Sequence, residues 1–298
     1  MKRLLKCGIS LIFLAATCAL GFLLRVLGVK RTGTCTVLYY HSIPPDQRAK
    51  FAQQLDVLLR YAKPICVADR VELESGMRYV GVTFDDGFAN FVEVALPELA
   101  RRNIPSTVFV VADALGKAFG PNGHAERVMS IHQLQQLPNL VTIGSHTSTH
   151  PFLPSLNESD ARRELVQSRK KIEEILKSNT QVFSFPFGGF DQKLVDLCRQ
   201  VGYRRVFTTL PYLAFEDPDE FVVGRVRVDP KDWSIEFRLK LAGAYRWLPT
   251  AFSLKRRLFL SPVIHKLFGV RNGLNQRPAP HSRIQDLYPK SGKQQLGI

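Results

Sequence analysis

The chain has 298 residues, 45% of them hydrophobic and 22% charged, and this composition excludes a disordered or fibrous protein. Its formal net charge of +15 would suit a nucleic-acid-binding protein, but the excess lies entirely in residues 1–31 and 246–298, whereas residues 32–245 carry 25 basic and 25 acidic side chains. A neutral body with basic ends argues against a nucleic acid as partner and favours contact with an anionic membrane surface.

The amino-terminal segment, residues 1–31, contains an uncharged run of 18 residues, Cys7–Leu24, with three basic residues on each side. Such a run is at the short end of what spans a bilayer and is longer than most signal-peptide cores. We predict an uncleaved signal anchor, with a cleaved signal peptide and a buried helix as the alternatives. Because both flanks are basic, charge does not orient the helix, and a domain outside the cytoplasm is the expectation for a signal anchor.

Residues 32–245 alternate between apolar strand patterns and amphipathic helix patterns, which predicts a single α/β domain with a parallel sheet. Helices are expected over 51–61, 88–102 and 191–201, and a longer one begins at Asn157, a favourable N-cap residue. Eight strands are expected, at 36–41, 64–67, 78–84, 106–111, 140–145, 181–187, 204–209 and 221–228. That number favours a barrel over an open sheet, and in such barrels the chemistry lies at the carboxyl ends of the strands.

Two polar motifs follow predicted strands and together form a candidate metal centre. Asp85 and Asp86 come directly after one strand, and two adjacent carboxylates at a strand end need a neutralising partner such as a metal ion. His146 and His150 come after another strand, and a spacing of four residues on a helical turn puts both imidazoles on one side. Two histidines and one aspartate leave an open position on a divalent metal for the activation of water, and the second aspartate is free to act as general base.

Three further strand ends carry candidate residues. His41 follows the first strand of the body, after two tyrosines. The strand at 181–187 runs into a pair of glycines, where backbone N–H groups can approach a ligand closely. In the last strand, Arg225 and Asp229 share a face, and an arginine beside a carboxyl group would lower the pKa of that group.

These motifs resemble those of the polysaccharide deacetylase family, also called the NodB-homology or carbohydrate esterase 4 family. The run 83–87, Thr-Phe-Asp-Asp-Gly, matches the first motif of that family, and the run from His146 to His150 matches its metal-binding motif. The resemblance covers about residues 35–235 and implies a distorted (β/α)7 barrel with a divalent metal, usually Zn²⁺. It implies that Asp86, His146 and His150 are the metal ligands and that Asp85 is the catalytic base.

The sequence departs from the family pattern at two places. Ser184 stands where the third motif of the family usually has an arginine, and no Leu-x-His motif that would supply the general acid is evident late in the chain. In the branch that resembles deacetylases of biofilm poly-N-acetylglucosamine, the acid histidine precedes the first motif in a Tyr-His context, which His41 fits. We expect Arg225, or failing that Arg227, to replace the missing arginine beside Asp85.

Two residues are expected on the substrate side of the site. The family position whose backbone N–H stabilises the oxyanion corresponds to Phe187. Asp229 begins a run that resembles the family's Asp-x-x-Asp-Trp element.

The expected function is removal of N-acetyl groups from an amino-sugar polysaccharide by a membrane-anchored, zinc-dependent hydrolase with its catalytic domain over residues 32–245. Asp85 would take a proton from the attacking water and His41 would protonate the leaving amine. A deacetylase or deformylase of a lipid-linked sugar is the nearest alternative, and a catalytically inactive carbohydrate-binding relic is another. In the basic tail, 246–298, residues 252–270 suit either an interfacial amphipathic helix or part of a disordered segment.

Overall fold

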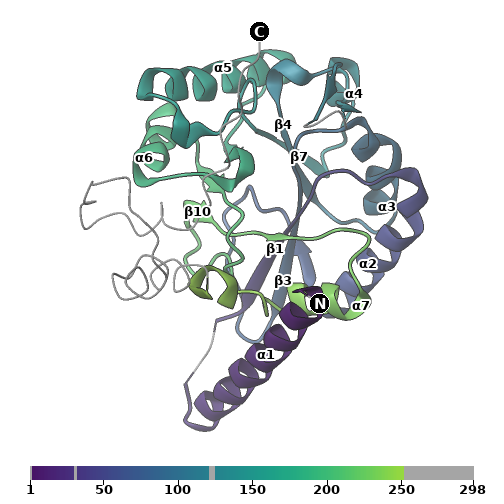
Figure 1. Ribbon diagram of the computed structural model, residues 1–298, viewed down its shortest axis with the longest axis vertical. Helices are drawn as coiled ribbons and strands as arrows, with labels where there is room; N and C mark the ends of the chain where they lie inside the picture. The colour runs from purple at the N-terminus through teal and green to yellow at the C-terminus, as the bar shows by residue number, and fades with distance from the viewer. Residues whose placement is uncertain (1, 30–31, 121–124, 252–298) are drawn as a thin grey trace, which may run out of the picture.

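The computed structural model describes residues 2–29, 32–120 and 125–251, and Figure 1 shows a curled sheet surrounded by helices. Among these residues, nine strands form one sheet in the order β10-β9-β8-β7-β4-β3-β1-β11, with β2 paired to β3 off this path. Every pairing in this sheet is parallel. The strands are β1 (Thr34–Tyr40), β2 (Lys63–Ile65), β3 (Arg78–Phe84), β4 (Ser106–Val110), β7 (Val141–Ser145), β8 (Val182–Ser184), β9 (Arg205–Phe207), β10 (Val222–Val223) and β11 (Val226–Arg227).

The sheet closes through the short segment that contains β10 and β11. β10 pairs with β9 at one end of the sheet, and β11 pairs with β1 at the other end. Gly224 and Arg225 lie between these two pairings, and a Cβ on Gly224 would lie 2.5 Å from the carbonyl oxygen of Leu210. Six strands and this shared segment make the seven positions of a distorted (β/α)7 barrel, which confirms the predicted fold class.

Alternate residues of the strands face the barrel interior or the surrounding helices, as expected for a sheet buried on both faces. Val37, Phe109 and Phe207 belong to the interior cluster, and all three are fully buried. Leu38 and Val82 belong to the outer cluster, which also contains the buried residues of the helices that pack on the barrel.

Helices cover the outside of the barrel, each with one apolar stripe toward the strands. In α5 (Glu158–Leu176), Asn157 caps the amino terminus by accepting a hydrogen bond from the backbone N–H of Asp160. One stripe of this helix is buried, at Ala161, Leu165, Ser168 and Ile172, and Leu176 at its end is partly buried. The other helices of the barrel are α2 (Arg48–Tyr61), α3 (Leu96–Arg101), α4 (Ile131–Gln135), α6 (Gln192–Val201) and α7 (Ser234–Leu241).

The helix predicted over 88–102 is interrupted. A π-helical turn spans Phe91–Ala95, and α3 begins at Leu96. Pro97 has no N–H to donate to the carbonyl one turn earlier, which accounts for the irregular hydrogen bonding at this point. A short antiparallel hairpin, β5 (Ala118–Phe119) with β6 (Glu126–Arg127), follows β4 and was not predicted.

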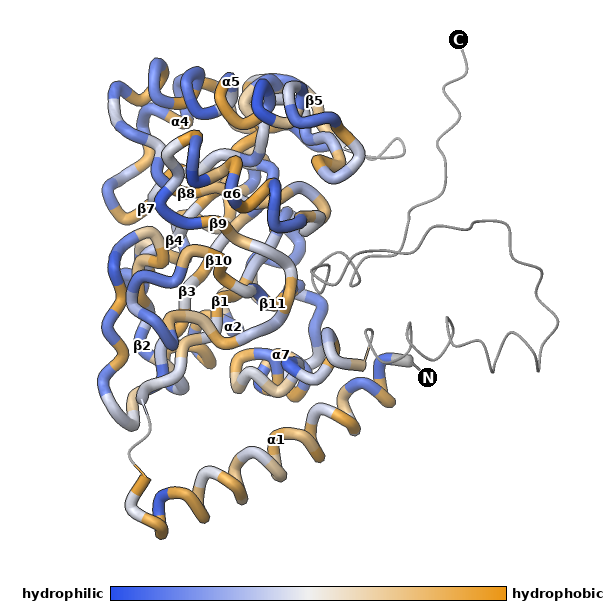
Figure 2. Tube along the Cα trace, turned by 90° about the vertical axis from the view of Figure 1, so that its left-hand side faces the viewer, coloured by the Kyte–Doolittle hydropathy of each residue, from blue (hydrophilic) through white to orange (hydrophobic). Residues whose placement is uncertain are grey.

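The amino-terminal helix α1 (Lys2–Val26) runs past the end of the barrel at which β1 and β3 begin, and most of its residues are hydrophobic (Figure 2). Its length and hydropathy are sufficient to cross a membrane, and only 17% of its most apolar window is buried. These properties fit a membrane anchor or a signal sequence rather than a buried core helix. Residues 252–270, expected to be either an amphipathic helix or part of a disordered segment, lie outside the described residues.

Polar contacts join α1 to α7 and the turn after it. The Arg3 guanidinium donates a 2.5 Å hydrogen bond to Glu236 and stacks on the Trp233 ring at 4.4 Å. Further along α1, the Ser10 hydroxyl accepts a hydrogen bond from the Trp247 indole at 2.9 Å.

Candidate active site

The polar residues singled out in the sequence converge at the carboxyl ends of the strands. Asp85 and Asp86 follow β3, His41 follows β1, and the loop with His146 and His150 follows β7. Ser184 ends β8, Phe187 lies in the turn after it, and Arg225 lies between β10 and β11. Because all these strands are parallel, their ends meet at one face of the barrel, as expected for the chemical face of such a fold.

The backbone at this face takes up left-handed conformations that side chains rarely adopt. Asp86, Thr147, His150 and Phe187 have φ values of 70°, 66°, 62° and 57°. Each such residue costs about 1–3 kcal/mol, and strain of this kind clusters at functional sites. Gly87 also has a positive φ, and a Cβ there would lie 2.8 Å from a methyl carbon of Val110.

Asp85 forms a buried, bidentate ion pair with Arg225. The Arg225 Nη1 and Nη2 groups donate to the two carboxylate oxygens of Asp85 at 2.7 and 2.8 Å. Burial alone would raise the pKa of Asp85, but the attraction of Arg225 and His146 and the hydrogen bonds from Arg225 outweigh it and lower the pKa to about 2. Asp85 is therefore ionised at neutral pH, as a general base must be.

The Arg225 guanidinium makes further hydrogen bonds besides its ion pair with Asp85. Besides Asp85, it donates to the hydroxyls of Thr83 and Ser184 at 3.0 and 2.7 Å and to the Thr208 carbonyl at 3.1 Å. The group is fully buried and lies over the Tyr39 ring at 4.7 Å, a cation–π contact. Because its Nη2 reaches Ser184, Arg225 enters the space where the family pattern places an arginine at position 184.

Asp86, His146 and His150 form a group that fits a divalent cation. The Oδ1 of Asp86 lies 3.4 Å from Nε2 of His150 and 3.7 Å from Nε2 of His146, and the three ligand atoms lie within 4.8 Å of one another. This Oδ1 is buried and has no hydrogen-bond partner among the described residues. Burial and the charges of Asp85 and Glu126 raise the pKa of Asp86 to about 7, so a cation would relieve the repulsion.

Both imidazoles are set up to present Nε2. The Nδ1 of His146 lies 2.7 Å from the Ser184 carbonyl oxygen, so it carries the proton and leaves Nε2 free as a ligand. Burial lowers the pKa of His146 to about 4 and that of His150 to about 3. The two rings are therefore neutral at neutral pH, which is the form that binds a metal.

A carboxylate from α5, which sequence reasoning missed, holds the loop that carries the two histidines. One oxygen of Glu164 accepts hydrogen bonds from the backbone N–H groups of Ser148 and Thr149, both at 2.9 Å. The other accepts from the Thr149 hydroxyl at 2.8 Å. Glu164 lies on a helix 16 residues beyond Ser148, and the sequence has no local signal that would pair it with this loop.

His41 lies at the rim of the same face. Burial lowers its pKa, whereas the nearby charges of Asp85 and Asp229 act to raise it. The next residue, Ser42, donates a 2.5 Å hydrogen bond to Glu126 of the β5–β6 hairpin. That hairpin therefore borders the site on the side of His41, although no pattern in the sequence predicted it.

Aromatic rings border the group formed by Asp86, His146 and His150. The Phe187 and Phe119 rings contact the His150 ring edge-on, at centroid distances of 4.6 and 5.3 Å. Phe187 is 61% exposed, so it presents an open apolar surface beside the histidine. Asp229 takes part in a turn in which one of its oxygens accepts the backbone N–H of Lys231 at 2.8 Å.

Arg227 is exposed on the strand next to Arg225, and the ion pair with Asp85 is formed by Arg225. The structure thus distinguishes the two arginines that the sequence offered.

At the carboxyl ends of its parallel strands, the barrel thus has a buried carboxylate–arginine pair beside an Asp-His-His group that could hold a metal ion. Residues 73–206 match the family model described as polysaccharide deacetylase. The matched segment contains Asp85, Asp86 and both histidines, whereas His41 and Arg225 lie outside it.

The chain is also similar to individual polysaccharide deacetylases. The chain is 26% identical over 149 residues to the putative polysaccharide deacetylase YxkH of Bacillus subtilis, covering 50% of this chain and 51% of that protein. It is 24% identical over 162 residues to the poly-beta-1,6-N-acetyl-D-glucosamine N-deacetylase of Staphylococcus epidermidis, covering 51% and 55%. The chain thus spans about half the length of these two relatives.

The fold matches that of IcaB from Ammonifex degensii, with a TM-score of 0.60 and 25% identity. The match covers 72% of this chain and 98% of that one.

Proposed function

We propose that this chain is a metal-dependent hydrolase that removes N-acetyl groups from an amino-sugar polysaccharide. The observation that carries the proposal is the buried Asp85–Arg225 pair directly beside the group formed by Asp86, His146 and His150. An ionised carboxylate next to a set of neutral imidazoles and an unpartnered carboxylate oxygen suits hydrolysis of an amide by water. The sequence similarity to a poly-beta-1,6-N-acetyl-D-glucosamine N-deacetylase supports a β-linked amino-sugar polymer as substrate.

Asp86, His146 and His150 would hold the cation, with Zn²⁺ the metal that their donor set suits best. When bound, the cation supplies Lewis-acid polarisation of the acetyl carbonyl and of the attacking water. The chain's own residues provide the rest of the chemistry.

In this mechanism Asp85 accepts a proton from water as the oxygen attacks the acetyl carbonyl carbon. Arg225 fixes the direction of that carboxylate through its two parallel hydrogen bonds. His41 gives a proton to the amide nitrogen as the C–N bond breaks, so that acetate and a free amine leave. The backbone N–H of Phe187 is assigned to the oxyanion, and Asp229 is assigned to the substrate side, where its charge also favours protonated His41.

The domain limits follow from these assignments. Residues 32–245 form the catalytic domain, residues 1–31 the signal anchor, and residues 246–298 the basic tail. The exposed apolar surface of α1 and a polysaccharide substrate together support a domain anchored at the outer side of a membrane.

The test is release of acetate from N-acetylglucosamine oligomers by the full chain in detergent, with and without added Zn²⁺. Zinc-dependent release supports the proposal. A tightly bound metal without release would point to a lipid-linked sugar as substrate. Absence of both would leave the carbohydrate-binding relic.

A further inference from the structure

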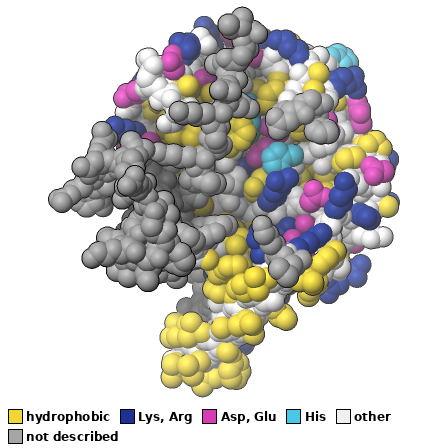
Figure 3. Space-filling model, in the orientation of Figure 1, with side chains coloured by type: hydrophobic (Ala, Val, Ile, Leu, Met, Phe, Trp, Pro, Cys, Tyr) yellow, Lys and Arg dark blue, Asp and Glu magenta, His cyan; other side chains and the backbone are white. Residues whose placement is uncertain are grey.

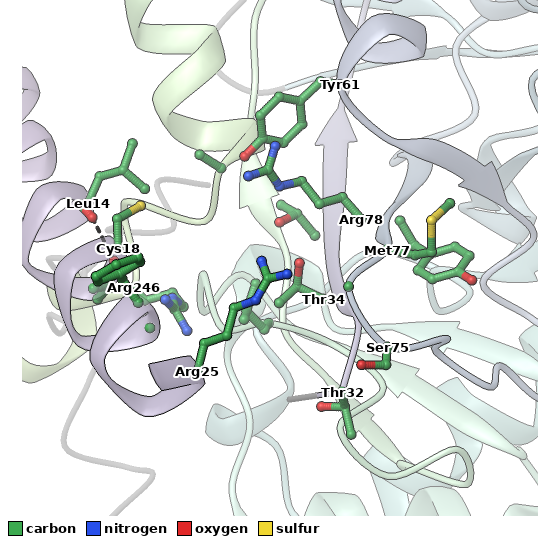
Figure 4. Close-up of a pocket in the computed structure, with 18 of the residues that line it drawn as sticks. Leu14, Cys18, Arg25, Thr32, Thr34, Tyr61, Ser75, Met77, Arg78 and Arg246 are labelled. Atoms are coloured by element: carbon green, nitrogen blue, oxygen red, sulfur yellow. Dashed lines mark hydrogen bonds between the residues drawn. The ribbon is translucent and has the colours of Figure 1, made fainter. Parts of the chain in front are cut away.

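A cavity of about 780 Å³ lies between α1 and the barrel, well away from the catalytic face (Figure 4). It is bordered by the first residues of β1 and β3, including Thr34 and Arg78, whereas Asp85 follows the last residue of β3. A strand rises about 3.3 Å per residue, so the seven residues of β3 place the cavity roughly 20 Å from the catalytic carboxylate. Its volume is within the range of sites that hold a small ligand, about 300–1,000 Å³.

The lining of this cavity is cationic. Figure 4 shows Arg25 of α1, Arg78 of β3 and Arg246 of the turn after α7 extending toward the space between α1 and the barrel, and the lining contains no Asp or Glu. Arg78 stacks on the Tyr61 ring at 4.6 Å, which fixes its direction. Among residues 2–29, 32–120 and 125–251, no ion pair joins Arg25 or Arg78 to a carboxylate. Three guanidinium groups at one cavity without a carboxylate in its lining favour a ligand with a phosphate or another multivalent anion.

The same cavity is continuous with an exposed apolar surface. Phe22 lines it and is 71% exposed, and Leu20 and Leu23 of the same helix are more than half exposed. In the space-filling view, hydrophobic side chains cover the visible face of α1 (Figure 3). A free nucleotide or an acidic peptide would leave this surface in water, whereas an amphiphile with an anionic head covers both parts.

We propose that this cavity binds the phosphate headgroup of an anionic membrane lipid. Arg25, Arg78 and Arg246 contact the phosphate, and the acyl chains lie along the exposed apolar side of α1. Polar contacts such as Arg3 with Glu236 and Ser10 with Trp247 hold α1 against the domain, so in this arrangement the helix lies at the membrane surface with its outer face in lipid. The site is separate from the proposed deacetylase centre and does not depend on it.

The test uses the full chain in a nonionic detergent and native mass spectrometry, with three probes: dioctanoyl phosphatidylglycerol, dioctanoyl phosphatidylcholine and inorganic phosphate. We expect one phosphatidylglycerol per chain to be retained in preference to the zwitterionic lipid. Arg25→Gln with Arg78→Gln should weaken this binding at least tenfold, since each basic residue near an anionic lipid contributes about 1 kcal/mol. If the double variant is unstable, Arg25→Gln alone serves as the test, because Arg25 is at an exposed helical position. It should weaken lipid binding by a smaller factor in the same direction.

The matched control is Lys193→Gln with Arg204→Gln, which removes the same charge from exposed positions outside the cavity. It should change lipid binding less than twofold. Equal binding in both double variants, or equal retention of the two lipids, would overturn the proposal. Inorganic phosphate binding as tightly as the anionic lipid would also overturn it and make a free phosphate the ligand. Acetate release by the cavity variant should stay within twofold of wild type, which separates this site from the catalytic one.

Discussion

Replacing Arg225 with methionine tests whether the buried ion pair sets the state of the catalytic carboxylate. The substitution keeps an unbranched side chain of similar length but removes two hydrogen bonds to Asp85 and those to Thr83, Ser184 and Thr208. Removing one partner of a buried ion pair costs about 3–5 kcal/mol of unfolding free energy, because it leaves the other charge buried and unpaired. We expect a loss of stability in that range.

The effect on the Asp85 carboxylate follows from the same contact. Unit charges 4 Å apart attract by about 4 kcal/mol at an effective dielectric constant of 20. One pKa unit corresponds to about 1.4 kcal/mol, so losing Arg225 should raise the pKa of Asp85 by roughly three units. Its starting value is about 2. The acid limb of the kcat/KM profile should therefore move to higher pH. At pH 7, kcat/KM should fall about 10²–10⁴-fold because the base is no longer held in its direction.

The assay is acetate release between pH 4 and 8, at a temperature below the midpoint of unfolding of every variant. Arg205→Met is the matched control, since Arg205 is also buried but donates its hydrogen bonds to backbone carbonyls, including those of Val67 and Glu220. It should lose stability yet keep kcat within about threefold. Adding Ser184→Arg to the Arg225→Met variant should raise the kcat/KM of that variant at least tenfold. A folded Arg225→Met protein with kcat/KM near the wild-type value would refute the reasoning.

Three further variants test other parts of the account. Chelation of the metal, or His146→Ala, should abolish acetate release. The control His132→Ala, at an exposed position of α4, should change the rate less than twofold. Full activity of the chelated protein would contradict the metal site. Glu164→Gln should weaken Zn²⁺ binding about 10-fold or more, measured by calorimetry, because the loop that carries the histidines loses its anchor; an unchanged affinity would count against this role. Glu98→Gln should lower the free energy of unfolding by about 1 kcal/mol at pH 7, since Glu98 accepts hydrogen bonds from Arg48 and Arg102. These arginines lower the pKa of Glu98, although burial opposes them. The difference in unfolding free energy between wild type and Glu98→Gln should therefore shrink as the pH falls below 4.5. Urea unfolding at pH 7 and pH 3.5 measures this difference.

The sequence predicted the barrel well because its strands are buried on both faces and read as apolar runs. Strand β3 was predicted at 78–84 and spans the same residues in the structure. The last predicted strand, 221–228, is divided into β10 and β11, because its two halves pair with opposite ends of the sheet. This change of pairing partner within one segment depends on closure of the barrel, which leaves no local pattern in the sequence.

The candidate site was predictable where its residues occur in short motifs. The Asp85–Asp86 and His146–His150 runs could be placed at strand ends from spacing alone, and the structure brings Asp86 and the two histidines together. The pairing of Arg225 with Asp85 crosses 140 residues, and it was expected only because the resembling family has an arginine where this chain has Ser184. Glu164 could not be found in this way, because an acidic residue on an amphipathic helix is ordinarily part of its solvated face.

The most direct test of the central claim is to compare Asp85→Asn with wild type in one preparation of the zinc-loaded full chain. The account assigns Asp85 to proton removal and leaves it out of the metal ligands, so this variant should still bind one Zn²⁺ per chain. Its rate of acetate release from N-acetylglucosamine oligomers should fall at least 10²-fold, the lower range for loss of a general base. Retention of Zn²⁺ together with a rate within a few-fold of wild type would contradict the account.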